Sequence, residues 1–249
     1  IDLNEKSSVK KIIGVVSGKG GVGKSFVTSM LACEMARRGY RVGVLDGDIT
    51  GPSQTKAFGI HEKAMGDGKY IYPYITKNGI QVISTNMILD SDETPVIWRG
   101  PMVANILKQF YTDVVWDNVD YMFVDMPPGT SDVPLTAFQS FPLDGIVVVT
   151  SPQELVSMVV EKAINMAQSM DIKVLGLIEN MSYVECPNCN EKIEIFGKSH
   201  INEVSEKYGL PVLAKIPMRQ TVAASADDGT MEDLEIPEIK DAVSFIEGK

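Results

Sequence analysis

One segment of the sequence has the residue types and the spacing to bind phosphate, the eight residues GKGGVGKS at positions 18–25. It satisfies the pattern G-x-x-x-x-G-K-[ST] and stands between an apolar run and a helical pattern, which is the context that this motif requires. Its glycines let successive backbone N–H groups converge on an anion, and the start of a helix adds the positive end of its dipole. Lys24 can reach the β- and γ-phosphates, and the Ser25 hydroxyl can bind Mg²⁺. The sequence therefore predicts a site for ATP and Mg²⁺, with a fortuitous glycine-rich turn as the weaker alternative.

Acidic residues follow two other apolar runs. Asp46 and Asp48 come after one of them, and Asp125 ends the other. An aspartate at the end of a strand is by itself more often a turn former or a helix cap. Beside a bound triphosphate, however, carboxylates are tolerable only where they hold metal or position water, because like charges otherwise repel. Together with the glycine segment, these acids predict an ATPase, with Asp125 in the place of the Mg²⁺-holding acid.

Cys186 and Cys189 form a C-x-x-C pair in a predicted loop after a strand. Such a pair is used by Zn²⁺ sites, iron-sulfur clusters and thiol redox centres, and the redox use is less favoured because it prefers a helix start early in a βαβ unit. Two thiolates leave two ligand positions unfilled for either metal group, and a two-fold homodimer would bring two pairs together. His200 is a weaker candidate for a further ligand. Cys33 falls inside a helical pattern, where a small buried hydrophobe is expected.

The elements that would position these residues are predicted from hydrophobic pattern. Short runs rich in valine and isoleucine alternate with segments of helical period, which is typical of strands covered on both faces. Strands are predicted over 12–17, 42–46, 80–84, 121–125, 145–150, 174–179 and 212–216, and helices from Lys24 to about Gly39 and over 101–112, 153–170, 201–208 and 237–247. We therefore expect one α/β domain over 1–249, a doubly wound, mostly parallel sheet with helices on both faces.

The least regular stretches lie at 51–78 and 180–200, each between the end of a strand and the next helix. Loops at the carboxyl ends of strands build the site in doubly wound sheets, so both stretches are expected to contribute to it. Met158, Met166 and Met170 stand at helical spacing and are predicted to be core or interface residues rather than a metal site. No pattern supports a role for His61.

Composition and charge exclude some partners. The chain has 249 residues, 33 acidic against 23 basic side chains and a formal charge of −10, so its field should repel nucleic acid and anionic membranes. No apolar stretch approaches the ~18 residues of a membrane span, and positions 1–9 have no signal-peptide core. Three cysteines are too few for a disulfide framework. We expect a cytoplasmic protein that binds neither nucleic acid nor membrane.

The glycine segment also resembles a particular group of ATPases, because it carries a second lysine, Lys19, directly after its first glycine. This resembles the deviant Walker A motif of the MinD/ParA/nitrogenase-iron-protein group, whose members dimerise with nucleotide between the subunits. Further motifs narrow the resemblance: WRGPM at 98–102, DMPPGTSD at 125–132, ENMSY at 179–183 and CPNC at 186–189. Together they are similar to the Mrp/ApbC family of cytosolic iron-sulfur cluster carrier ATPases, from about Lys11 to about Gly229.

The resemblance implies a role for each matching residue. Lys19 would reach the partner's phosphates, Lys24 would act on the nucleotide, and Asp48 would place the attacking water. Mg²⁺ would be held by Ser25, Asp48 and Asp125, with Gly129 facing the γ-phosphate and with Asn180 and 217–219 near adenine. The full set assigned to nucleotide is Gly18, Gly20, Gly21, Val22, Gly23, Lys24, Ser25, Phe26, Gly129, Asn180, Pro217 and Arg219. Phe26 departs from the family, whose members usually carry threonine there.

The resemblance also implies a homodimer that holds a bridging [4Fe-4S] cluster through Cys186 and Cys189, transfers it to apo iron-sulfur proteins and hydrolyses ATP slowly during transfer. Trp98 and Arg99 would contribute to the dimer surface or simply to packing. Many bacterial members carry a small additional N-terminal domain, whereas the strand before the glycine segment here begins about ten residues in.

Two alternatives keep the same nucleotide site. One is a spatial organiser of the MinD or ParA kind acting on membrane or DNA, which would need a basic C-terminal helix or surface. Residues 231–249 carry six acidic side chains against two lysines, which disfavours it. The other is a dimeric targeting ATPase with Zn²⁺ between the C-x-x-C pairs, which would need an apolar helical insertion, and none is evident between the motifs.

Overall fold

The computed structural model describes residues 2–49, 51–88, 100–130, 132–139, 141–152 and 156–249. Eight of its described strands form one sheet in the order β12-β9-β8-β1-β7-β2-β6-β5. The strands are β1 (Val9–Ser17), β2 (Val42–Asp46), β5 (Tyr74–Ile75), β6 (Gln81–Ile83), β7 (Val119–Asp125), β8 (Gly145–Thr150), β9 (Val174–Glu179) and β12 (Val212–Lys215). Every pairing in this sheet is parallel except that of β5 with β6. The predicted doubly wound, mostly parallel sheet is confirmed.

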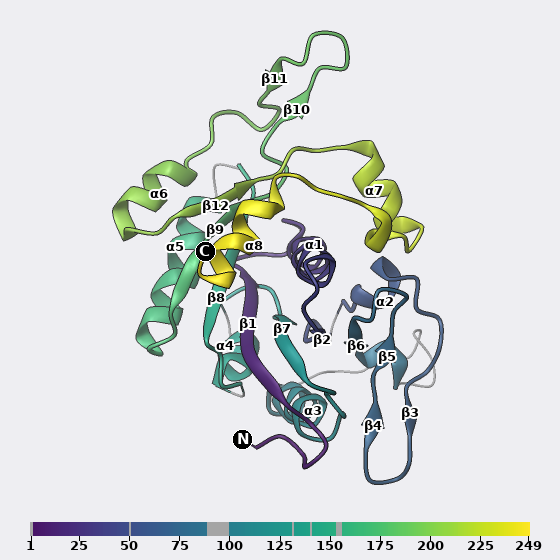
Figure 1. Ribbon diagram of the computed structural model, residues 1–249. Coiled ribbons are helices and arrows are strands. Elements are labelled where there is room, and N and C mark those ends of the chain that lie inside the picture. Colours follow the sequence, from purple (N-terminus) through teal and green to yellow (C-terminus); the bar gives the residue numbers. More distant parts are fainter. Residues whose placement is uncertain (1, 50, 89–99, 131, 140, 153–155) are drawn as a thin grey trace.

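Helices cover both faces of the sheet, as Figure 1 shows. Helix α1 packs against α8 on one face, while α3, α4 and α5 lie on the other. The described helices are α1 (Lys24–Arg37), α2 (Gln54–Ala57), α3 (Gly100–Thr112), α4 (Asp132–Gln139), α5 (Val156–Ser169), α6 (Ile201–Tyr208), α7 (Gln220–Asp227) and α8 (Ile239–Glu247), with short 3-10 turns η1 (Thr85–Met87) and η2 (Met231–Asp233). None of the helices in this described part is long and apolar enough to cross a membrane.

The central strands are buried along most of their length, because helices cover both of their faces. A partly buried network of ion pairs connects the two helices of one face. Arg38, just after α1, donates to Glu34 on its own helix at 3.1 Å and to Glu247 of α8 at 2.7 Å. The apolar face of α8, which includes Val243 and Ile246, is buried against the body. This packing fixes the helix that follows the phosphate segment.

The predicted strands and helices of the sheet match the structure, but several short elements were not predicted. Helices α4 and α7 lack a long apolar stripe, and α7 has no buried residue. The hairpins β3 (Met65–Gly66) with β4 (Ile71–Tyr72), and β10 (Val184–Glu185) with β11 (Lys192–Ile193), have strands of two residues, too short for alternation to appear. Trp98 and Arg99, and positions 153–155 of the predicted helix 153–170, lie outside the described residues.

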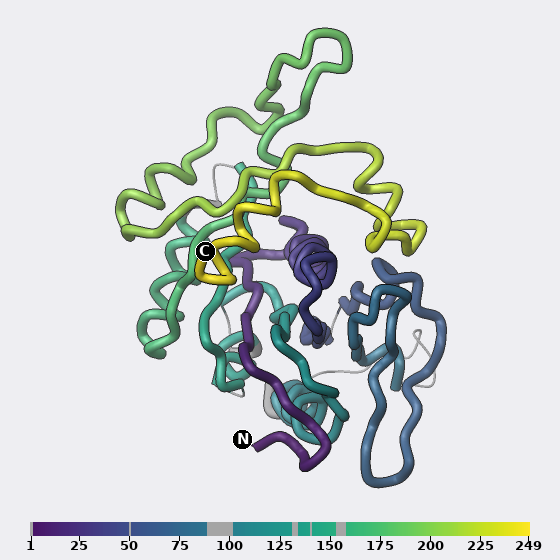
Figure 2. Tube along the Cα trace, in the orientation of Figure 1, coloured from purple at the N-terminus to yellow at the C-terminus, as the bar shows by residue number. Residues whose placement is uncertain are grey.

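The β10–β11 hairpin stands apart from the body of the molecule. In Figure 2 it extends away from the sheet at the top of the view, beyond the segment that carries α7. Residues 187–198, which include its tip, are exposed throughout, among them Ile193, Ile195 and Phe196. The hairpin is therefore a projecting arm that few side chains of this chain cover.

Candidate nucleotide and metal sites

The phosphate segment connects the end of β1 to the start of α1. The hydroxyl of Ser17 donates to the carbonyl of Lys19 at 2.9 Å, and the N–H of Gly129, after β7, donates to the carbonyl of Ser17 at 2.9 Å. Gly23, at the start of α1, has φ 82°, in the left-handed region that favours glycine. A Cβ there would lie 2.1 Å from Nδ2 of Asn180. The loop therefore has one defined shape, with Gly129 beside it.

The other glycines of the segment divide into two kinds. A Cβ on Gly18 would lie 2.4 Å from Val159 of α5, so this helix packs closely against the loop at Gly18. A Cβ on Gly20 or Gly21 would meet no atom within 4 Å. The outer side of the loop is therefore open, and a phosphate group has room to approach its backbone N–H groups. The carbonyl of Val22 accepts from Asn180 Nδ2 at 3.0 Å, which ties the loop to the end of β9.

Lys24 lies between two carboxylates at the carboxyl ends of β2 and β7. Its ammonium pairs with Asp125 and lies 3.8 Å from Oδ2 of Asp48. The lysine is 5% exposed and Asp125 is fully buried, so this cation neutralises charge inside the protein. Residues predicted from separate motifs are thus brought together in one place.

Gln54 is a member of the site that sequence reasoning missed. Its Nε2 donates to Oδ2 of Asp125 at 2.8 Å and to the carbonyl of Ser25 at 2.9 Å, and its Oε1 accepts from Ser29 at 2.8 Å. The side chain is fully buried and holds Asp125 against the start of α1. The only signal was its place in the irregular stretch 51–78, because no motif marks a glutamine.

Asp46 shapes the loop that presents Asp48. Its Oδ2 accepts from the backbone N–H groups of Ser53 and Gln54 and from the hydroxyl of Ser84, each at 3.1 Å. Burial and the charge of Asp125 raise the pKa of Asp46 to about 7, against the opposing effect of those hydrogen bonds and of Lys24. Because Asp46 and Asp125 are neighbouring buried acids, a cation bound beside them is favoured.

The donor groups here fit Mg²⁺. Asp48 and Asp125 both lie within reach of one ammonium group, which marks a position that two carboxylates share. Ser25, the second residue of α1, follows Lys24, and its carbonyl accepts a hydrogen bond from Gln54. Carboxylate and hydroxyl oxygens are ligands that Mg²⁺ takes, usually together with phosphate oxygens and water. Asp48, Asp125 and Ser25 would hold it, and it would neutralise charge on the phosphates.

A groove opens beside the phosphate segment, with a volume of about 620 Å³. Phe26, Asn180, Pro217 and Arg219, which come from three places in the sequence, all line it. Its walls are mostly apolar, and Met181, Val184, Met218 and Val222 complete much of them. A flat aromatic base fits such a surface, where a guanidinium group can stack on it. Phe26 stands where members of the similar family usually carry threonine, and it adds an apolar side chain to the wall of this groove.

The cysteine pair lies at the arm formed by β10 and β11. Cys186 follows β10; its N–H donates to the carbonyl of Glu191 and its carbonyl accepts from the N–H of Asn190, both at 2.9 Å. The backbone N–H groups of Asn188 and Cys189 and the Cys189 side chain lower the pKa of the Cys186 thiol below its ordinary value. Cys189 is exposed. The turn therefore favours the thiolate form of Cys186, which is the form that binds metal.

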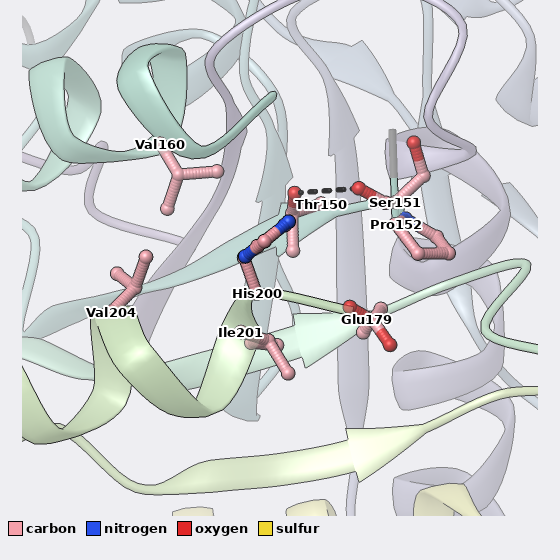
Figure 3. A pocket seen from close by; sticks show the side chains of 8 residues that line it. All are labelled: Thr150, Ser151, Pro152, Val160, Glu179, His200, Ile201 and Val204. Atoms are coloured by element: carbon pink, nitrogen blue, oxygen red, sulfur yellow. Dashed lines mark hydrogen bonds between the residues drawn. The ribbon is translucent and has the colours of Figure 1, made fainter. Parts of the chain in front are cut away.

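The remaining candidates lie elsewhere. His200 contacts Glu203 at 3.2 Å and lines a cavity of about 20 Å³ with Thr150 and Glu179, drawn in Figure 3, which has room for about one water molecule. No group of three or more metal-ligating side chains forms among the described residues, so His200 does not join the cysteines. Cys33 is buried in the core as predicted, and burial raises its pKa to about 12.

Met158 and Met166 of α5 and Met170, directly after it, do not share one environment. Met166 and Met170 pack, partly buried, against the core, which agrees with their predicted place. Met158 is 62% exposed, so it is not a core residue of this chain. Helical spacing alone could not separate them, because it places residues on one stripe without saying how far the protein body extends along it.

The sheet, the glycine loop and the acids at neighbouring strand ends define a P-loop NTPase. Comparison with known proteins narrows this class. Residues 8–247 match the family described as NUBPL iron-transfer P-loop NTPase, within ParA. An iron-sulfur cluster carrier protein of Clostridium perfringens is 46% identical over 234 residues, which cover 91% of this chain and 82% of that protein. The chain belongs to this family of iron-sulfur cluster carrier P-loop NTPases.

Solved structures agree with the assignment. A nucleotide-binding protein from Archaeoglobus fulgidus, in complex with ADP and with Co found by PIXE, is 38% identical with a TM-score of 0.84, over 93% of this chain and 91% of that one. The cell division ATPase MinD of Pyrococcus furiosus has a TM-score of 0.68 at 21% identity, covering 96% of this chain and 98% of its own. The similarity to MinD shows that the two proteins share a fold.

Proposed function

We propose that this protein is a homodimeric ATPase that carries a [4Fe-4S] cluster between its two copies and transfers it to apo iron-sulfur proteins. Cys186 and Cys189 of each copy supply the four thiolates. ATP hydrolysis is slow and coupled to transfer. The family assignment supports the carrier role, and the relative with bound ADP supports a nucleotide at the glycine loop.

At the nucleotide, Lys24 would leave the acids and bind the phosphates once Mg²⁺ takes its place between Asp48 and Asp125. The present ion pairs support this exchange, because they hold a cation where the metal would lie. Asp48 would orient the attacking water. Lys19 would act on the phosphates of the partner copy, and the base would lie in the groove lined by Phe26 and Arg219.

The metal proposal rests mainly on one observation. A half-buried Cys186, whose thiol has a lowered pKa, and an exposed Cys189 stand on a projecting arm that offers no third ligand among the described residues. Either Zn²⁺ or a four-iron cluster takes four ligands in its common protein sites. A second copy related by a two-fold axis supplies two more thiolates of the same kind. The cluster is the cargo of the reaction, and an exposed site suits a cargo that must leave.

The test is metal analysis of protein purified and reconstituted without oxygen. We expect a brown dimer with about four irons and little zinc. The double substitution Cys186→Ala/Cys189→Ala should abolish iron binding, whereas His200→Ala should retain it. Retention of the cluster by the double variant, or zinc in place of iron under these conditions, would contradict the proposal.

The alternative as a membrane or DNA organiser has less support. The apolar face of α8 is buried against the body, so this helix does not present a free amphipathic face. The MinD likeness is at a level of identity that speaks for the fold only. Sedimentation with liposomes or DNA in the presence of ATP would detect such a role directly.

A further inference from the structure

Two parts of this chain are adjacent. One is the groove beside the phosphate segment, called the base groove because it would hold the nucleotide base. The other is the cysteine arm, formed by β10 and β11. Val184 of β10 lines the groove, and Cys186 follows two residues later. The N–H of Met218, also in the groove wall, donates to the carbonyl of Tyr183 at 2.8 Å. The arm thus starts from a wall of the groove, and a change in that wall has a short path to the thiols.

Arg219 makes the link between them. Its Nη1 and Nη2 pair with the carboxylate of Glu238 at 2.8 and 2.5 Å, and Nη2 lies 3.8 Å from Oε2 of Glu185, the residue directly before Cys186. The Arg219 side chain is 30% exposed and the Glu185 side chain 42%. The guanidinium group of Arg219 therefore lies at the groove and contacts both the body, through Glu238, and the start of the arm, through Glu185.

The strength of the two pairs differs. The Glu238 pair is bidentate and short, so it anchors Arg219 to the start of α8. The Glu185 pair is single, longer and more exposed, so it is the one that a small displacement breaks. A base entering the groove would contact the Arg219 side chain, and a planar guanidinium stacks readily on a flat ring.

We propose that Arg219 is a positioning residue that transmits occupancy of the base groove to the cysteine arm through Glu185. Base binding reorients the guanidinium, changes its pairing with Glu185 and shifts Cys186 and Cys189 relative to the body. The purpose of this coupling, which would be to control release of the cluster, rests on the proposed function. The coupling itself is a property of the chain with no metal bound, and it can be measured there.

The experiment is the alkylation of Cys186 and Cys189 by iodoacetamide in the reduced, metal-free full chain, with and without Mg-ADP. Cys33 is buried with a raised pKa and serves as an internal reference that does not react in the folded protein. The quantity of interest is the ratio of the rates with and without ADP. An exposed ion pair of this kind corresponds to about a 1.5- to 5-fold effect on that ratio.

Glu185→Gln should bring the ratio close to one, and Glu194→Gln, an equal charge change on the exposed part of the same arm, should keep the wild-type ratio. Pyrophosphate, which lacks the base, should leave the rate unchanged. A purely structural role of Glu185 would change both rates equally and leave the ratio as in wild type, which would overturn the proposal. So would an effect of pyrophosphate equal to that of ADP, or no effect of ADP in the wild type.

Iron content measured on the same preparations separates the two claims. If Glu185→Gln removes the ADP effect while the wild type binds no cluster, the coupling stands and the carrier role fails. If the wild type binds its cluster and ADP does not change the alkylation rate of its cysteines, the carrier role stands and the coupling fails.

Discussion

The phosphate segment and the cysteine arm differ in how much of each site one chain supplies. Around Lys24, the two carboxylates, the glutamine and the loop backbone all have partners within this chain and are mostly buried. On the arm, Cys186 and Cys189 have local turn contacts, and the residues beyond them are exposed. The groups of the first site are held in place without a ligand, whereas the cysteine pair has no third metal-ligating side chain beside it among the residues that the structure describes.

This difference follows from position in the fold. The nucleotide groups stand at the carboxyl ends of parallel central strands, where buried neighbours hold them. The arm consists of two strands of two residues each, and an isolated hairpin has little intrinsic stability in water. A fixed site suits catalysis, which requires groups held in place. A loosely held site suits the binding and release of cargo.

The largest expected effect is at Lys24. Lys24→Ala should lower the rate of ATP hydrolysis by about 10²–10³-fold, because a donor to developing phosphate charge is lost. Lys56→Ala, which removes an exposed lysine paired with Asp227 on the surface, is the control and should retain the wild-type rate. Steady-state phosphate release measures both. Similar rates for the two variants would contradict the assigned role of Lys24.

A second pair of variants tests how rigid the glycine loop is. Gly23→Ala should destabilise the nucleotide-free protein by about 1–3 kcal/mol, because its backbone is left-handed and a Cβ would clash with Asn180. Gly20→Ala has open space and should change the free energy of unfolding by less than about 0.5 kcal/mol. Urea unfolding of both variants gives the difference. Equal free energies would mean that the loop is not held by Asn180.

A third set of variants asks whether the cysteine arm contributes to stability. Cys186→Ala/Cys189→Ala should alter the free energy of unfolding of the metal-free chain by less than about 0.5 kcal/mol, since both residues lie on the exposed arm. Cys33→Ala should cost about 1 kcal/mol or more, because it leaves a cavity in the core. Should the arm variant prove the more destabilised of the two, the arm would be part of the folded body.

The smallest effect concerns the pH dependence of thiol reactivity. The pKa of Cys186 is lowered, so its thiolate should persist at lower pH than that of an ordinary thiol, and its alkylation rate should reach half-maximum below pH 9.0. Cys33, with a pKa of about 12, should stay unreactive until the protein unfolds. Mass spectrometry of alkylated peptides across pH follows each residue. A midpoint for Cys186 at or above 9.0 would remove the support that the turn gives to a thiolate.

Much of the sheet could be predicted from the sequence, because its strands are continuous buried runs. The predicted 42–46, 145–150 and 174–179 coincide with β2, β8 and β9. The antiparallel edge strand β5 and the arm hairpin could not be predicted in this way, since two residues carry no period. Their placement depends on tertiary contacts such as those of β5 with β6.

The site divides in the same way. Lys24, Asp48 and Asp125 could be named because their types and spacing match a chemical requirement, and the structure brings them together. Gln54 and the Arg219 pairing with Glu185 could not, because these contacts join residues 71 and 34 positions apart by folding alone. Sequence motifs identify groups that do chemistry; the groups that hold them become visible only in three dimensions.

The most direct test of the central claim is the mass and iron content of the species that carries the cluster, measured by native mass spectrometry without oxygen. We predict about four irons on a species of two chains and none on a single chain. Mixed dimers with one wild-type copy and one Cys186→Ala/Cys189→Ala copy should lose the cluster. A cluster held by one chain, or retained by the mixed dimer, would contradict the claim that two copies complete the site.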